Sequence, residues 1–196
     1  LPQYDEQYKE PTMVIYSGYV ESGCGAADSG VGPFYCTRDQ TIYLDLSFYD
    51  TLIQRYGAQQ GDFIMNYVIA HEAGHHVQTL LGVTDQLNSL RQRVATGQMS
   101  QTEFNEYSVR YELQADYLAG VVAKYQANRG YLEEGDLEEA MSAAAAVGDD
   151  SIQQKAQGYV DPDTFNHGTS QQRQTWFMKG FRAGDLSEWD TFNASI

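Results

Sequence analysis

Positive charge is scarce in this chain. Lys and Arg together number 12 among its 196 residues, against 27 Asp and Glu, so the formal net charge is −15 at pH 7. A protein that binds nucleic acid needs a basic patch, and this composition argues against that class of function. Long apolar runs are also missing, because no stretch approaches the roughly 18 apolar residues that a membrane-spanning helix requires. We therefore expect no nucleic-acid partner and no membrane span within this chain.

Cysteine occurs only twice, as Cys24 and Cys36, around a Gly-rich stretch. The pair lacks the CxxC unit of common zinc-binding cysteine sites, so a disulfide between the two is the preferred interpretation. Such a bond indicates an oxidising compartment. The chain also starts at Leu1 rather than at Met. We expect an extracytoplasmic protein, either secreted or anchored by a segment absent from this chain.

Histidine is scarce too, and two of the four histidines fall in the segment HEAGH at residues 71–75. The flanking residues, from Asp62 as the expected N-cap, have the apolar spacing of a helix. Residues four apart on a helix lie one turn apart on the same face, so His71 and His75 point the same way. Two neutral imidazoles so placed can hold Zn²⁺, and Glu72 can act as a general base on water. The segment predicts one zinc ion per chain.

A catalytic zinc site needs a third protein ligand. A helix predicted at residues 101–127 supplies Glu112, with Asp116 four residues later on the same face. Carboxylates among apolar neighbours are costly unless they are paired or bound to a metal, so we assign Glu112 to the zinc. Asp116 is assigned to the second N–H of a ligand histidine, which it would orient. A solvated acidic face is the alternative for this pair. His76 points about 100° away from its neighbour and is interpreted as structural or exposed.

These segments carry a family resemblance. VIAHEAGHHVQ at residues 68–78 and SVRYELQAD at residues 108–116 resemble the putative neutral zinc metallopeptidase family of bacteria. Further segments resemble it in order and spacing, namely GPFYC at 32–36, YLDLSF at 43–48, AAAAVGDD at 143–150 and HGTSQQR at 167–173. The resemblance covers nearly the whole chain.

The resemblance implies both a fold and a set of roles. The fold is α+β, mainly helical and zincin-like, with the active-site helix and the ligand helix packed on a small sheet with an N-terminal hairpin. His71, His75 and Glu112 are implied as zinc ligands, as in gluzincins, and Glu72 as the catalytic base. A second disulfide found in many relatives is absent, because Tyr117 and Trp189 stand at those positions.

In zincins, the strand before the active-site helix is a sheet edge that pairs with extended substrate. The resemblance gives this role to residues 42–46, and hence to Tyr43, Leu44 and Asp45. Residues 34–36 and 41–46 are expected to form a hairpin, and residues 12–20 a strand or extended segment.

The chain is interpreted as a single domain, 1–196, in which residues 1–11 form a loosely held arm. Residues 21–33 read as a Gly/Ser loop. Helices are expected at about 47–56, 62–81, 86–95, 101–127, 136–147, 150–157 and 169–182.

His167 precedes the last of these helices, and Arg173 follows it by six residues. A loop histidine at such a position can donate a hydrogen bond to the oxyanion that develops during peptide hydrolysis. Related peptidases resemble this chain in that spacing. An ordinary loop histidine is the alternative. Arg173 is expected either to pair with Asp116 or another active-site carboxylate, or to anchor the C-terminal helix.

The preferred function is zinc-dependent endopeptidase activity on a peptide or protein substrate, with Glu72 as general base. Two other classes stay open. One is a catalytically silent zinc-binding module that binds a partner, and the other is a metallohydrolase of small amides. A deep closed pocket would favour the small-amide enzyme, and an open groove would favour the peptidase.

Overall fold

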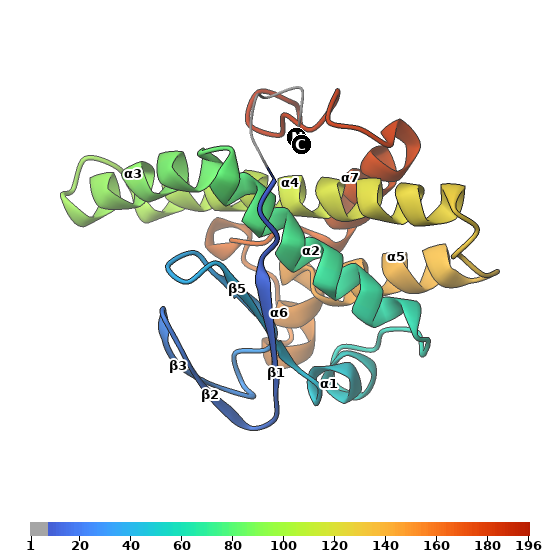
Figure 1. The fold of residues 1–196 in the computed structure, drawn as a ribbon. Coiled ribbons are helices and arrows are strands. Elements are labelled where there is room, and N and C mark those ends of the chain that lie inside the picture. Colours follow the sequence, from blue (N-terminus) through green and yellow to red (C-terminus); the bar gives the residue numbers. More distant parts are fainter. Residues whose placement is uncertain (1–7) are drawn as a thin grey trace.

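The computed structural model describes residues 8–196, which contain five strands and seven α-helices. The strands are β1 (Thr12–Tyr16), β2 (Tyr19–Ser22), β3 (Gly25–Asp28), β4 (Phe34–Cys36) and β5 (Thr41–Asp45). The helices are α1 (Phe48–Gln54), α2 (Phe63–Leu80), α3 (Val83–Ala95), α4 (Gln101–Asn128), α5 (Asp136–Ala146), α6 (Asp149–Gln157) and α7 (Ser170–Ala183). The expected α+β, mainly helical class is confirmed (Figure 1). Of the expected N-terminal arm, residues 1–7 lie outside the described residues.

The larger sheet has the strand order β1-β5-β4, with β1 parallel and β4 antiparallel to β5. The prediction that residues 42–46, with Tyr43, Leu44 and Asp45, form a substrate-binding edge is therefore wrong, because β5 is buried along its length, pairs with β1 at residues 41–45 and is covered by β4 at residues 41–43. The local pattern does not reveal that the distant strand β1 pairs with β5, since each strand is compatible with several partners. The free edge on the antiparallel side of the sheet belongs to β4.

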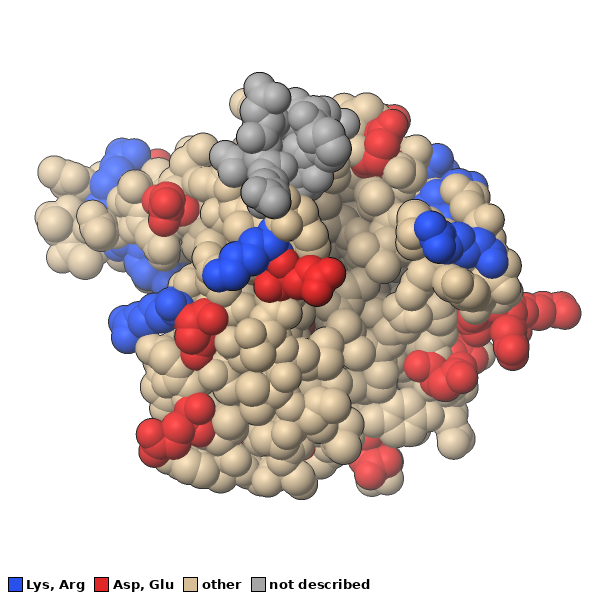
Figure 2. Space-filling model, viewed as in Figure 1, with Lys and Arg blue, Asp and Glu red and all other residues tan. Residues whose placement is uncertain are grey.

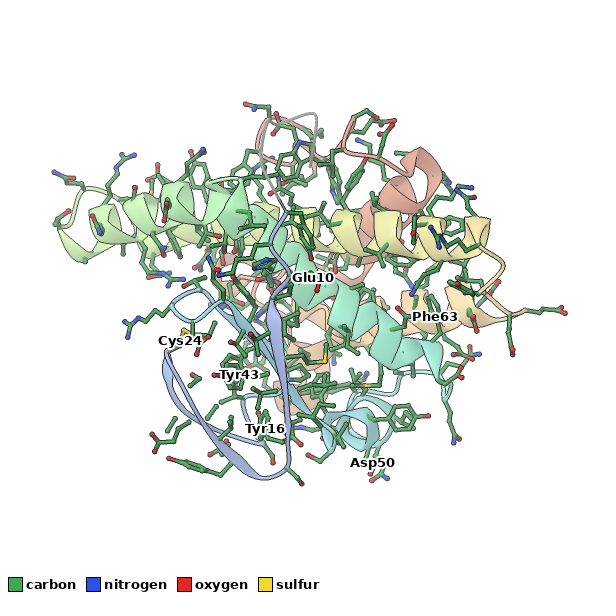
Figure 3. The ribbon with its side chains drawn as sticks, in the orientation of Figure 1. Glu10, Tyr16, Cys24, Tyr43, Asp50 and Phe63 are labelled. Atoms are coloured by element: carbon green, nitrogen blue, oxygen red, sulfur yellow. A yellow bond between two sulfur atoms is a disulfide. The ribbon has the colours of Figure 1, made fainter. Side chains whose placement is uncertain are left out.

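The segment before β4 contains more strand than the sequence predicts. The expected strand at 12–20 is interrupted at Gly18, whose φ of 85° is the left-handed conformation that glycine adopts at little cost. The expected loop at 21–33 contains most of the β2–β3 hairpin. The predicted disulfide is confirmed, because Cys24 in the hairpin turn is bonded to Cys36 at the end of β4. Figure 3 shows Tyr16 and Tyr43 close together beside β1, in the small apolar cluster that also contains Cys36.

The two long helices meet through small residues. A Cβ on Gly74 of α2 would lie 3.1 Å from both Cα and O of Ala115, so only a very small residue lets α4 come this close. On its other side α4 packs on α7, where a Cβ on Gly120 or Gly180 would overlap a backbone carbonyl of the opposite helix. α4 thus packs chiefly between α2 and α7, while α2 also contacts β4 and β5. No described helix is both long and apolar enough to cross a membrane.

The start of α2 differs from its predicted cap. Asp62 stands at the N-cap position, but its side chain accepts no capping hydrogen bond. The backbone N–H of Phe63 instead donates to Glu139 Oε2 on α5, at 3.0 Å. A carboxylate from another helix therefore satisfies one of the free N–H groups at this end. Asp136, near Glu139 on α5, accepts a hydrogen bond from the backbone N–H of Glu133 at 2.8 Å. The carboxylates of Glu139 and Asp136 are therefore both explained by structural hydrogen bonds.

His76 is fully buried and lies on the side of α2 away from the other two histidines of the helix. Its Nδ1 lies 2.9 Å from the hydroxyl of Tyr35, and its Nε2 lies 2.6 Å from the backbone oxygen of Lys9. This histidine therefore joins α2 to β4 and to the first described residues of the chain. Both ring nitrogens have partners, which leaves neither for a metal.

Candidate metal centre

Three side chains converge where α2 passes α4. His71 Nε2 lies 3.2 Å from one carboxylate oxygen of Glu112, and His75 Nε2 lies 3.5 Å from the other. Ligand atoms of the three residues all lie within 4.8 Å of one another. The four-residue spacing places both imidazoles on one face of α2, and the close approach at Gly74 brings α4 within reach. The structure thus brings together the three residues that the sequence assigns to zinc.

The second ring nitrogen of each histidine has its own partner. His71 Nδ1 lies 2.9 Å from Asp116 Oδ1, and His75 Nδ1 lies 2.8 Å from Gln78 Oε1. Because both partners are acceptors, each Nδ1 donates a hydrogen bond, and each ring is oriented with its Nε2 toward Glu112. The ring of Tyr111 stacks on His75 with centroids 4.9 Å apart, which holds the imidazole plane.

Asp116 stands at the centre of a buried polar network behind His71. Arg173 donates to it twice, from Nε to Oδ2 at 2.8 Å and from Nη2 to Oδ1 at 3.0 Å. The hydroxyl of Tyr67 donates to Oδ1 at 2.6 Å. Burial alone would raise the pKa of Asp116, but the charges of Arg173 and His71 outweigh it and lower the pKa to about 2. The carboxylate therefore stays ionised and keeps His71 oriented.

The electrostatics of the site favour a cation. Burial opposes protonation of His71, yet Asp116 and the hydrogen bond to Glu112 raise its pKa to about 10. Burial would raise the pKa of Glu112, but the neighbouring histidines hold it well below the ordinary value. The carboxylates of Asp116 and Glu112 thus face one buried guanidinium, and this excess of negative charge favours protonation of His71. A dication at the three converging atoms would supply the missing positive charge, and two imidazole nitrogens with one carboxylate oxygen are a donor set typical of catalytic zinc.

Glu72 lies beside the candidate metal ligands on the wall of a cleft of about 630 Å³. It is 8% exposed, and its carboxylate has no hydrogen-bond partner among residues 8–196. A nearly buried carboxylate without a partner faces the cleft and can accept a proton from a molecule bound there.

The cleft extends to both sides of the ligands. Its lining includes residues of α1, β4, α2, α3, α4 and α6. Tyr43, Leu44 and Asp45 are not among them, whereas Phe34 and Tyr35 of β4 are. Asp45 instead accepts hydrogen bonds from the backbone N–H and the hydroxyl of Ser47, both at 2.9 Å, and so shapes the turn before α1.

His167 lines the same cleft as the metal ligands, although it lies far from them in sequence. Its Nδ1 lies 3.1 Å from Asp149 Oδ1, while Asp149 Oδ2 accepts the backbone N–H groups of residues 166, 167 and 168 at 2.7–3.0 Å. Burial would lower the pKa of His167, but the hydrogen bond to Asp149 and the charge of Glu112 raise it above its ordinary value. The half-exposed ring therefore keeps Nε2 as a donor available to the cleft.

Four residues that complete the site were not singled out from the sequence, namely Tyr67, Gln78, Tyr111 and Asp149. The first two had a detectable signal, because Tyr67 lies four residues before His71 and Gln78 three residues after His75 on the same helix face. Tyr111 and Asp149 had no such signal in the sequence. Tyr111 adjoins Glu112 and Asp149 lies on another helix, and both reach the site only through tertiary packing.

Comparison with known proteins agrees with this geometry. The family model described as "Putative neutral zinc metallopeptidase" matches residues 1–192. The chain is 52% identical over 189 residues to "Uncharacterized protein YpfJ" of Escherichia coli K12, and 45% identical over 198 residues to "Uncharacterized protein Rv2575" of Mycobacterium tuberculosis H37Rv. Each alignment covers 96% of this chain and 64% of the relative, so the chain spans slightly less than two thirds of their length. No solved structure matches the chain.

Proposed function

The chain belongs to the putative neutral zinc metallopeptidase family, and from this premise we propose that it is a zinc-dependent endopeptidase. The observation that carries the proposal is the convergence of His71 Nε2, His75 Nε2 and the Glu112 carboxylate beside the unpartnered carboxylate of Glu72. Three protein ligands are the number typical of catalytic zinc sites, and these three residues would hold the ion with one position left for water. When bound, zinc supplies Lewis-acid polarisation of water and of a substrate carbonyl.

Glu72 is the proton carrier in this proposal. Its carboxylate takes a proton from the attacking water and then passes that proton to the leaving amine of the cleaved peptide bond. The carboxylate is nearly buried yet accessible from the cleft, and no described side chain competes for it. Those are the surroundings that a general base needs before substrate binds.

His167 is the donor to the oxyanion. Its Nδ1 is occupied by Asp149, so the ring can donate only from Nε2. The raised pKa of His167 increases the doubly protonated share of the ring at a given pH, and a charged donor stabilises an oxyanion more strongly than a neutral one. Asp149 thereby positions His167 without touching the reacting atoms.

The substrate binds as an added strand along β4. The outer edge of β4 has no partner strand in the described sheet, and both Phe34 and Tyr35 line the cleft. An extended peptide can form main-chain hydrogen bonds with such an edge, and these bonds are independent of sequence. This role replaces the one that the sequence led us to expect for residues 42–46.

Two observations bear on the alternative functions. The cleft continues on both sides of the ligands, from α1 and α6 at one end to α3 at the other, and this length suits a peptide better than a small amide. The unpartnered Glu72 is unnecessary for a module that only binds zinc, and its presence favours hydrolysis over a silent scaffold.

The confirmed disulfide extends the proposal to location, because such a bond persists in an oxidising compartment. We accordingly assign the enzyme to the outside of the cytoplasm. The relatives are longer than this chain. Any assignment of natural substrates and partners to a whole protein of that length is therefore part of the same proposal.

Digestion of a defined peptide mixture, read by mass spectrometry, tests the function. Zinc-loaded protein should cleave internal bonds, chelation should abolish cleavage, and added zinc should restore it. Zinc-loaded protein that cleaves nothing would support the silent module. Cleavage of capped dipeptides but not of longer peptides would support the small-amide hydrolase.

A further inference from the structure

The cleft is apolar at the end nearest the start of α2. Val68 lies one turn before His71 and lines the cleft together with Phe48, Leu52 and Val147. These four side chains belong to one apolar cluster of the core, and Leu52 is completely buried within it. Ile152 of α6 completes the wall at this end. Such a recess gains the free energy of apolar burial when it receives a large hydrocarbon or aromatic side chain.

The opposite end of the cleft is formed by α3 and carries positive charge. Arg91 lines the cleft there, next to Asn88. Its guanidinium lies 5.5 Å from the ring centroid of Phe104 and forms no ion pair with a described carboxylate. The other arginine of the cleft, Arg173, is already paired with Asp116. Figure 2 shows basic side chains at the end of the molecule that α3 forms and another group at the opposite side, although the chain as a whole is strongly acidic.

The direction of β4 relates these two ends to the direction of a bound peptide. Gly32, just before β4, lies against the ring of Phe48 at the apolar end. Tyr35 contacts His76 in the second half of α2, after which the chain continues into α3. Figure 1 places the turn that follows β4 on the α3 side of the molecule and α1 on the other. β4 therefore runs from the apolar end toward the α3 end, and a peptide paired antiparallel to it runs the opposite way.

From this placement we infer the substrate class: peptides with a large apolar residue directly after the cleaved bond and an acidic residue within a few positions before it. The apolar side chain enters the recess around Val68 and Ile152, and the acidic side chain meets Arg91. The inference rests on the proposed peptidase function and adds selectivity to it. The inference includes antiparallel pairing of the peptide with β4, and this pairing determines which side of the bond meets which end of the cleft.

Quenched fluorogenic peptides of equal length test the two subsites separately. One series carries Leu, Phe, Gly or Asp after the cleaved bond, and a second places Asp or Lys at each of the three positions before it. We expect kcat/KM to be at least tenfold higher for Leu or Phe than for Gly or Asp. Asp should exceed Lys by roughly threefold at one of the positions before the bond, and this difference should shrink in high salt because Arg91 is exposed.

Charge-reversal variants assign each preference to a residue. Arg91→Glu should invert the preference between Asp and Lys, while Arg93→Glu, an equal change on the same helix but outside the cleft, should leave it intact. Ile152→Lys should lower cleavage before Leu and raise cleavage before Asp. Ile15→Lys, at an exposed isoleucine of β1, is the matched control.

Calorimetric binding of the same peptides to zinc-loaded Glu72→Gln separates this inference from the function on which it rests. Selective binding without cleavage by the wild type would refute the peptidase and keep the subsites. Cleavage without these preferences, or with the apolar residue required before the bond, would overturn the subsites and keep the peptidase. Absence of both binding and cleavage would overturn both.

Discussion

Arg173 of α7 and Asp116 of α4 form a buried ion pair through two hydrogen bonds, of 2.8 and 3.0 Å. Asp116 is also the acceptor for His71 Nδ1, so the pair connects the C-terminal helix to a candidate metal ligand. The contact depends on the close packing of α4 against α7, which Gly120 and Gly180 permit. The last helix of the chain thereby contributes to the orientation of a residue on α2.

Arg173→Met should destabilise the fold and weaken zinc binding together. Removal of one partner leaves the buried charge of Asp116 uncompensated, which typically costs about 3–5 kcal/mol of unfolding free energy. Zinc affinity should fall by roughly 10–100-fold, because Asp116 no longer holds His71 firmly. Urea denaturation and competitive zinc titration measure the two effects. Arg182→Met, at an exposed position of the same helix, should change neither.

Gln78→Met should weaken zinc binding and also lower the stability of the fold, because Nε2 of the buried Gln78 donates to Tyr111 O and Gln114 Oε1. The substitution keeps the length of the side chain but removes the acceptor that lies 2.8 Å from His75 Nδ1. We expect affinity for zinc to fall roughly 10–100-fold. Gln86→Met on the exposed face of α3 serves as the control. Equal affinity in the wild type and Gln78→Met would show that Gln78 does not orient His75.

The Asp149 carboxylate should make stability depend on pH in the acid range. Burial would raise its pKa, but hydrogen bonds from His167 and neighbouring backbone N–H groups lower it below the ordinary value. A depressed pKa in the folded state means that this stabilisation is complete above the unfolded value of about 3.9 and is lost as pH falls through the folded value. Asp149→Asn should therefore be less stable at pH 7 by about 1–3 kcal/mol, and the difference should shrink below about pH 4.

Chemical denaturation of Asp149→Asn and of the wild type across pH 3–7 measures this difference. Asp163→Asn, at an exposed acidic residue, provides the control. Parallel stability curves for the wild type and Asp149→Asn throughout the range would contradict the assignment.

His167→Ala should reduce turnover while zinc content stays unchanged. An oxyanion donor acts mainly in the transition state, so its removal lowers kcat by roughly 10²–10³ and affects KM little. Steady-state kinetics and metal analysis on the same preparation check both statements. A fully active, zinc-loaded His167→Ala would leave His167 as a residue that only shapes the loop before α7.

The parts of the site that could be predicted from the sequence are those that depend on helical periodicity. Spacings of four residues placed His71 with His75 and Glu112 with Asp116, and burial cost argued that the two carboxylates needed partners. The two pairs meet because two helices pack closely at Gly74. The helical spacing also indicated α2 and α4 nearly to their ends.

The remaining parts depend on contacts between distant segments. The order β1-β5-β4 makes β5, with Tyr43, Leu44 and Asp45, the central and buried strand of the sheet, and no local pattern distinguishes a central strand from an edge strand in a chain with such short strands. Asp149 and His167 meet only because the start of α6 packs beside the loop before α7.

The central claim is that zinc bound by His71, His75 and Glu112 supports peptide hydrolysis with Glu72 as the base. Glu72→Gln tests it most directly, since the amide preserves size and hydrogen-bonding shape but cannot take up the proton. The measurement is kcat on a cleaved peptide together with zinc content, with Glu138→Gln on the exposed face of α5 as the matched control. We predict full zinc occupancy with a loss of roughly 10²–10⁴ in kcat for Glu72→Gln and wild-type turnover for Glu138→Gln. Glu72→Gln that binds zinc and cleaves peptide at the wild-type rate would contradict the account.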